Sequence, residues 1–234
     1  MINKVNCILK FIKDKYKELI YKNSFILKIR KRKRIRDFNI YFKLIKDRIY
    51  SNFLIESLNE ASNLCHKDSI TVRELLIKIN VYLKYILNIK EGIVLLEEEI
   101  NLLVLFFSIE NIIYGSRAEL HIDIPKDMMN IRIPLLIFQP LIENSIKHGI
   151  FPKPIGGDIY IKAFDNQDRV EFIICDTGVG MSREEFEKVA LMKSFGLKNI
   201  KDRLEMLYGF NYHFKIESEI EGGTKVYLTL PKEV

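Results

Sequence analysis

The chain has 234 residues and a formal net charge of +6, with 48% hydrophobic and 29% charged residues. This composition indicates a globular protein with a sizeable core. No apolar run is long enough for a membrane span, and the lysine-rich start argues against a secretory signal. Three scattered cysteines, Cys7, Cys65 and Cys175, lack metal-site spacing and favour reduced thiols, so we expect a cytoplasmic protein.

Residues 1–36 predict a basic amphipathic helix. Residues 1–50 hold sixteen basic and four acidic residues, a local charge of +12, so the remainder carries −6. Apolar residues recur at helical spacing over residues 2–29. Such a helix can lie on the inner membrane surface, pair with a partner helix, or stay a solvated helix that covers part of its own core. Its charge would also suit nucleic acid, but no recognition motif accompanies it, so we expect no nucleic-acid partner.

Residues 37–114 predict a helical region. One helical pattern ends near Cys65, and after a polar break Thr71 and Glu74 have the spacing of a capping box for the next helix. A further helix is expected over residues 96–113. Two long helices joined by a short turn form an antiparallel hairpin with little core of its own. We therefore expect two copies to form a four-helix bundle, which makes the protein a homodimer.

Beyond residue 115 the pattern changes to alternating strands and helices. Alternating apolar residues predict strands over residues 118–124, 158–164 and 170–176, and two last strands flank Gly222-Gly223-Thr224. One helix is expected over residues 134–148 and another from about Gly196 to Tyr208. Residues 115–234 are therefore expected to form a second domain.

The helix expected before the second of these strands carries most of the polar chemistry. Gly149 follows its last turn and would cap it in a left-handed conformation. Its apolar stripe would run through Phe138, Leu141, Ile142 and Ser145-Ile146, and its opposite face would carry Gln139, Glu143, Asn144, Lys147 and His148. On that face Glu143 and Lys147 stack one turn apart, as do Asn144 and His148. These groups suit a metal–phosphate ligand, because hard cations take oxygen ligands and phosphates take cationic donors. The alternative is a solvated helix face with one ion pair.

Glycine-containing turns follow this helix. Asp176 leaves a buried strand, and its carboxylate can accept a hydrogen bond from an exocyclic amine, while Gly178 and Gly180 let the backbone approach a flat ring or a phosphate chain. Gly196 precedes a helix whose free N–H groups can bind phosphate. The Gly223-Thr224 pair gives another close approach. Each motif alone is compatible with an ordinary turn; their order along the chain is the informative part.

In this order the motifs resemble the ATP-binding domain shared by gyrases, histidine kinases and mismatch-repair ATPases, the Bergerat fold. The spellings FQPLIENSIKHG at 138–149 and GLKNIKDRL at 196–204 are similar to histidine kinases of the autolysin-regulator sensor type. Residues 37–114 resemble the dimerisation and phosphoacceptor region of that family. The resemblance implies an α+β fold: a helical dimerisation hairpin followed by a two-layer α/β sandwich.

The same resemblance implies a role for each motif residue. Asn144 would ligate Mg²⁺, Glu143 would orient or activate the transfer, and Lys147 and His148 would face the phosphates of ATP. Asp176 would bind the adenine amine. The remaining nucleotide contacts would come from Gly178, Gly180 and Met181 at the adenine, Gly196 and Leu197 at the triphosphate beneath a lid of roughly residues 181–195, and Gly223 and Thr224 beside the adenine. Catalysis would consist of positioning and charge neutralisation.

The chain departs from the family pattern at the phosphoacceptor. The family motif reads Pro-His-Phe-x-Phe-Asn, and the matching stretch here is Ser51–Glu56, so Asn52 stands in place of the histidine. An amide nitrogen is a poor nucleophile because its lone pair is delocalised. His66 lies about 21 Å further along a continuous helix, and so is no simple substitute. Ser194 also replaces a glycine expected before Gly196.

Three functions remain open on this evidence. The first is a sensor histidine kinase that binds Mg-ATP, has lost its own acceptor histidine, and acts on a related kinase in a mixed dimer or on a response regulator. The second is an active kinase with another acceptor residue. The third is a non-catalytic pseudokinase that signals by the nucleotide-dependent shape of its dimer.

Overall fold

The computed structural model describes residues 31–43, 53–65, 68–182, 184, 186 and 195–233. Several expectations lie outside these residues: the helix over residues 2–29, Asn52, His66, Ser194 and most of the lid.

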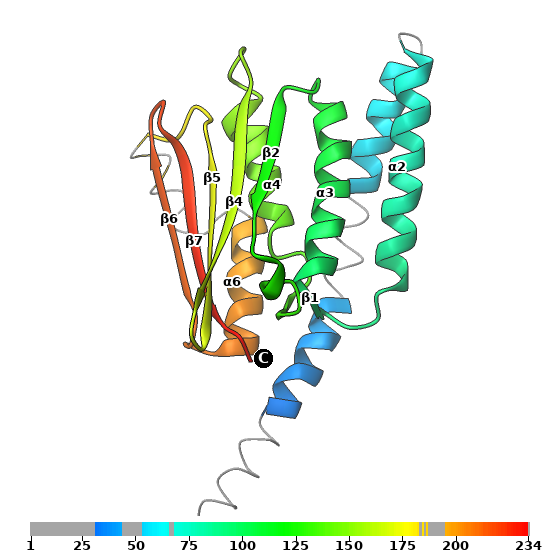
Figure 1. Ribbon diagram of the computed structural model, residues 1–234. Coiled ribbons are helices and arrows are strands. Elements are labelled where there is room, and N and C mark those ends of the chain that lie inside the picture. Colours follow the sequence, from blue (N-terminus) through cyan, green and yellow to red (C-terminus); the bar gives the residue numbers. More distant parts are fainter. Residues whose placement is uncertain are drawn as a thin grey trace, which may run out of the picture.

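A five-stranded mixed sheet forms one layer of the protein (Figure 1). The strand order is β2-β4-β5-β7-β6, and only the β2–β4 pair is parallel. The strands are β2 (Ala118–Asp123), β4 (Gly157–Asn166), β5 (Arg169–Asp176), β6 (His213–Glu219) and β7 (Gly223–Pro231). The alternation read from the sequence thus predicted each of these strands to within a few residues.

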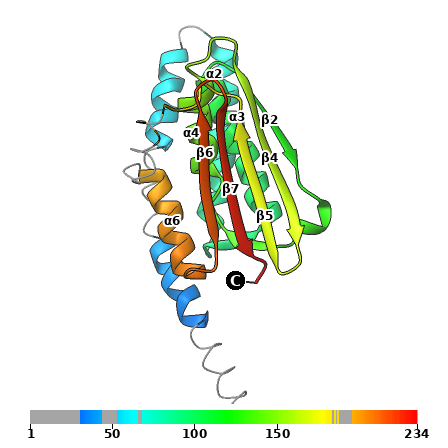
Figure 2. The ribbon, with the colours of Figure 1, turned by 90° about the vertical axis from the view of Figure 1, so that its left-hand side faces the viewer.

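Helices cover one face of this sheet (Figures 1 and 2). The nearest are α4 (Gln139–Asn144), which continues into the π-helical turn η2 (Ser145–Ile150), and α6 (Phe195–Tyr208). Next comes α3 (Leu96–Ile113), which contacts α4 on one side and α2 (Ser69–Asn88) on the other. Residues 31–43 and 53–64 are also helical. The arrangement confirms the α+β class.

Aromatic side chains join the helices and the sheet into one core. The ring of Phe53 lies 4.8 Å from Tyr82 and 5.5 Å from Phe106, which ties the helix of residues 53–64 to α2 and α3. Phe138, just before α4, packs edge-on against Phe172 of β5 at 5.0 Å. All five side chains are buried. These ring contacts therefore hold the helix of residues 53–64 against α2 and α3, and hold the start of α4 against β5.

The cap of α2 differs from the expected one. Asp68, and not Thr71, is the N-cap: its carboxylate accepts the backbone N–H groups of Ile70 and Thr71 at 3.1 Å. The Thr71 hydroxyl instead donates to Asp68 at 2.5 Å. The capping box centred on Thr71 and Glu74 was therefore wrong, because a better-placed carboxylate precedes it by three residues.

The expected helix over residues 134–148 was wrong at both ends. Its first residues form a loop in which Leu136 has φ 58°, and this loop is preceded by the short strand β3 (Arg132–Pro134), which pairs with β1 (Ile93–Leu95). The 3₁₀ turn η1 (Lys126–Met128) comes before β3. At the other end Gly149 does not adopt a left-handed conformation but lies within η2. Neither short strand had a recognisable pattern in the sequence.

The helices far from the sheet expose an apolar face. Ile55 on the helix of residues 53–64 is 58% exposed, and Ile70, Ile77 and Val81 on α2 are 80%, 54% and 51% exposed. Contiguous exposed apolar surface of this kind is typical of an association surface. Among the described residues, no helix is long and apolar enough to cross a bilayer.

Candidate nucleotide-binding site

A cavity of about 470 Å³ opens between the α4–η2 segment and one end of the sheet. The structure brings a large part of the predicted site together at its wall: Asn144, His148, Asp176, Gly180, Met181, Leu197 and Thr224. These residues come from four separate segments of the chain. The order of motifs in the sequence therefore corresponds to one place in the fold.

Asp176 lies at the end of β5 and is 6% exposed. Its Oδ1 accepts the backbone N–H groups of Gly178 and Thr224 at 2.9 and 3.2 Å, and its Oδ2 accepts the Ser145 hydroxyl at 2.8 Å. Burial raises the pKa of Asp176, and these three donors oppose the rise. A carboxylate has about four acceptor positions, so one remains for a ligand in the cavity.

Two of the predicted glycines are required by close backbone approaches. A Cβ on Gly178 would lie 2.4 Å from the Cα of Gly149, where η2 passes beneath the turn after β5. Gly223 has φ 76°, and a Cβ there would lie 2.0 Å from the carbonyl oxygen of Asp176. Both glycines support the floor of the cavity, although they are not among its lining residues.

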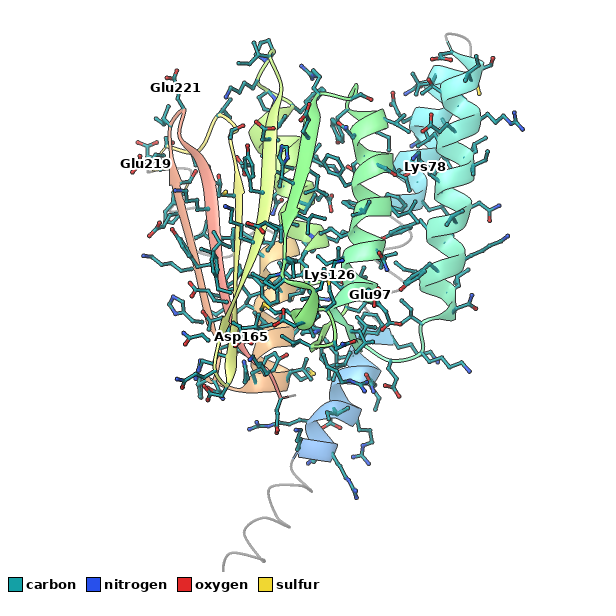
Figure 3. The ribbon with its side chains drawn as sticks, in the orientation of Figure 1. Lys78, Glu97, Lys126, Asp165, Glu219 and Glu221 are labelled. Atoms are coloured by element: carbon teal, nitrogen blue, oxygen red, sulfur yellow. The ribbon has the colours of Figure 1, made fainter. Side chains whose placement is uncertain are left out.

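The tip of the β6–β7 hairpin packs against the turn after β5, and Figure 3 labels Glu219 and Glu221 at this tip. The backbone N–H of Glu221 donates to the carbonyl of Val179 at 2.8 Å. A Cβ on Gly180 would lie 1.8 Å from the carbonyl oxygen of Glu219. The turn after β5 is therefore held against this hairpin.

Sequence reasoning missed several lining residues: Leu141, Ser145, Pro152, Val179, Ile216 and Val226. Ser145 had been placed in a buried apolar stripe, and a hydroxyl in such a stripe is a signal for a buried hydrogen-bond partner. Ile216 and Val226 are paired on β6 and β7 and supply apolar surface for a flat ring. Their strand alternation was visible in the sequence, but the face that borders the cavity was not.

Glu143 and Lys147 are not among the residues that line the cavity. The Lys147 ammonium lies 2.8 Å from a carboxylate oxygen of Glu143 and 2.8 Å from one of Glu56. Burial alone would lower the pKa of Lys147, but the hydrogen bonds to both carboxylates outweigh it, so the pKa is raised. The structure thus places Lys147 toward helix 53–64 rather than toward the cavity. The sequence could not show this, because Glu56 lies 91 residues away.

Gln139 was also expected on the polar face but is buried. Its side-chain oxygen accepts the Tyr82 hydroxyl at 2.6 Å. The α4–η2 segment is therefore connected to α2 as well as to the helix of residues 53–64.

Gly196 lies at the second position of α6, directly before the cavity-lining Leu197.

Residues 130–234 match the family model "Histidine kinase-, DNA gyrase B-, and HSP90-like ATPase", and residues 40–118 match the model "Histidine kinase". Sensor protein LytS of Bacillus anthracis is 29% identical over 200 residues, covering 82% of this chain and 34% of the relative. Sensor histidine kinase YpdA of Escherichia coli is 28% identical over 196 residues, with the same coverage. The chain spans about a third of the length of these curated relatives.

Among solved structures, the histidine kinase domain from the Erythrobacter litoralis EL346 blue-light activated histidine kinase has a TM-score of 0.48 at 11% identity. The match covers 85% of this chain and 94% of that one. The fold and the family matches place residues 130–234 with the ATPase domains of the Bergerat type. The chain is similar to sensor histidine kinases such as LytS, with a region that matches the histidine kinase model followed by one that matches the ATPase model.

Proposed function

We propose that this chain is the ATP-binding catalytic part of a sensor histidine kinase whose own acceptor histidine is replaced by Asn52. The observation that supports the proposal best is the Asp176 carboxylate, which is buried at a cavity of nucleotide size and held by three donors with one acceptor position to spare. An exocyclic amine of adenine has the hydrogen that this position needs.

The donor set also fits a metal-bound triphosphate. Asn144 presents an amide oxygen at the cavity, which is a ligand type that Mg²⁺ accepts, and His148 lies one turn further along. Gly196 and Leu197 begin α6 beside the cavity, where the triphosphate would lie. Bound Mg²⁺ would neutralise phosphate charge, while Asn144 and the other lining residues would hold the nucleotide in place. Glu143, one residue before Asn144, would orient the transfer from outside the cavity wall.

The partners follow from the surface and from the missing histidine. Val81 and the other exposed apolar residues of α2 and of the helix of residues 53–64 support dimerisation, either with a second copy or with a related histidine kinase. In a mixed dimer the phosphoryl group would go to the partner's histidine and then to a response regulator. We retain the division into a basic segment, residues 1–36, a dimerisation region, residues 37–114, and an ATP-binding domain, residues 115–234. We propose that the basic segment contacts the inner membrane surface.

The test begins with nucleotide binding. Calorimetry with Mg-ATP should show saturable binding, and Asp176→Asn should weaken it by about 10- to 100-fold, the usual worth of a hydrogen bond to a charged group. The change is nearly isosteric, and Asn can still accept from Gly178 and Thr224. Thr71→Ser, on α2 and far from the cavity, serves as the control. Equal affinity for Asp176→Asn and the parent protein would refute the proposed site.

Transfer is tested separately with γ-labelled ATP, with this chain alone and with a histidine-bearing homologue. Label on the homologue alone supports the proposal, and label on this chain indicates another acceptor residue. Binding without transfer in either mixture favours the pseudokinase that regulates a partner kinase or response regulator by its shape.

A further inference from the structure

The Lys147 ammonium joins the rim of the nucleotide cavity to the helix of residues 53–64. It is hydrogen-bonded to Glu56 from that helix and to Glu143 from α4, each at 2.8 Å, and its side chain is only 18% exposed. The residues that follow Glu143 and Lys147, Asn144 and His148, both line the cavity. The ion pair therefore lies beside the place proposed for the phosphates.

The charges around Lys147 are unbalanced. Glu110 on α3 is 2% exposed, and its Oε2 has no hydrogen-bond partner among the described residues. Burial raises the pKa of Glu110 to about 7, and the nearby charge of Lys147 opposes the rise. Together with Glu56 and Glu143, three carboxyl groups surround one ammonium. An anionic phosphate chain gains little attraction from Lys147 while its charge is neutralised in this way.

We propose that Glu56 and the phosphates of a bound nucleotide compete for the Lys147 ammonium, so that Glu56 restrains nucleotide binding. This inference rests on the Mg-ATP site proposed above. The exchange requires only rotation of a long, flexible side chain, because the packing of Phe53 against Tyr82 and Phe106 holds the helix independently. The two interactions are linked. If bound phosphates weaken the equilibrium between Lys147 and Glu56 by some factor, Glu56 weakens the affinity for the nucleotide by the same factor.

The competing charge lies at a position where this chain departs from the motif that it resembles. The family motif that resembles Ser51–Glu56 ends in asparagine, which is neutral, whereas this chain has a carboxylate there. A neutral side chain could accept a hydrogen bond from Lys147 but would leave its charge available to a phosphate. Among the departures from this motif, those at positions 52 and 56 therefore have different consequences: one removes the acceptor and the other adds a competitor.

The experiment measures the affinity of the full chain for Mg-ATP and for adenosine by calorimetry. Glu56→Gln keeps the shape of the side chain and removes its charge. Glu60→Gln is the matched control, because Glu60 lies one turn further along the same helix and its carboxylate accepts a hydrogen bond from Asn63. Lys147→Met, alone and combined with Glu56→Gln, tests whether any effect passes through the ammonium.

We expect Glu56→Gln to tighten Mg-ATP binding about fivefold or more, with adenosine affinity and the Glu60→Gln variant unchanged. In the Lys147→Met background the same change should have no effect. Unchanged or weaker Mg-ATP binding in Glu56→Gln, or an effect that persists without Lys147, would overturn the competition while leaving the nucleotide site intact. If neither the parent chain nor Glu56→Gln binds Mg-ATP, both proposals fail.

Discussion

Removing the buried guanidinium of Arg203 should destabilise the whole ATP-binding half. Arg203 on α6 is fully buried, and it donates to the carbonyl oxygens of Leu135 and Leu136 at 2.7 and 2.6 Å. Glu99 on α3 accepts the N–H groups of residues 136–138 at 2.6 to 3.1 Å. Burial raises the pKa of Glu99 to about 7 and lowers that of Arg203 to about 10. The two charges therefore hold opposite sides of the loop that begins α4.

Arg203→Met leaves the carbonyl groups of Leu135 and Leu136 without their donor. Each unpaired buried acceptor costs about 1–3 kcal/mol, so the two together are a large fraction of the roughly 5–15 kcal/mol by which domains are usually stable. We therefore expect the free energy of unfolding to fall by about 3–5 kcal/mol. Combining Arg203→Met with Glu99→Gln should cost less than the sum of the two single changes, because Glu99 and Arg203 hold the same loop.

The measurement is urea unfolding followed by far-UV circular dichroism, since the chain contains no tryptophan. Arg132→Met serves as the control: Arg132 is exposed, is 3.5 Å from Glu91, and should cost less than about 1 kcal/mol. A loss below about 1 kcal/mol for Arg203→Met, or strictly additive effects in the double variant, would refute the reasoning.

Three further variants probe the site and the surface. Gly178→Ala should abolish the thermal shift produced by Mg-ATP, because the new Cβ would lie 2.4 Å from Gly149; an unchanged shift would contradict this. The raised pKa of Glu110 means that the folded protein binds a proton between about pH 4.5 and 7 that the unfolded chain does not, so stability falls as pH rises through that range. In urea unfolding at pH 5.5 and 8, Glu110→Gln should reduce this fall by up to about 2 kcal/mol, and an equal fall in both proteins would contradict it. Val81→Glu on the exposed face of α2 should convert dimer to monomer in sedimentation, and an unchanged mass would argue against that face.

Local patterns in the sequence were enough for most of the architecture. The strand pairs β4–β5 and β6–β7 could be predicted from apolar alternation around turn residues, and α3 was expected within its observed bounds, Leu96–Ile113. The grouping of Asn144 and Asp176 at one cavity followed from motif order and family resemblance. These features depend on residues that are neighbours in the sequence, or on motifs that resemble those of a known family.

The parts that could not be predicted depend on partners far away in the sequence. The loop before α4 has no helical start because Glu99 accepts its N–H groups and Arg203 donates to its carbonyl oxygens, and these two residues lie on either side of it in the chain. A Cβ on Gly149 would lie 3.0 Å from Oδ1 of Asp176, which is distant in sequence, so Gly149 serves this contact rather than a helix cap. The contact of Lys147 with Glu56 was missed for the same reason, since Glu56 belongs to another region. No local pattern contains these partners.

The same long-range contacts join the proposed nucleotide site to the helix of residues 53–64. The segment that carries Asn144 is joined to α2 by the buried bond from Tyr82 to Gln139 and to the helix of residues 53–64 by the ion pair from Lys147 to Glu56. Glu56, one of the departures from the family motif, lies on that helix, whereas Asp176 and its three donors are in place. Under the two proposals, such a chain would retain nucleotide recognition and alter what the nucleotide competes with.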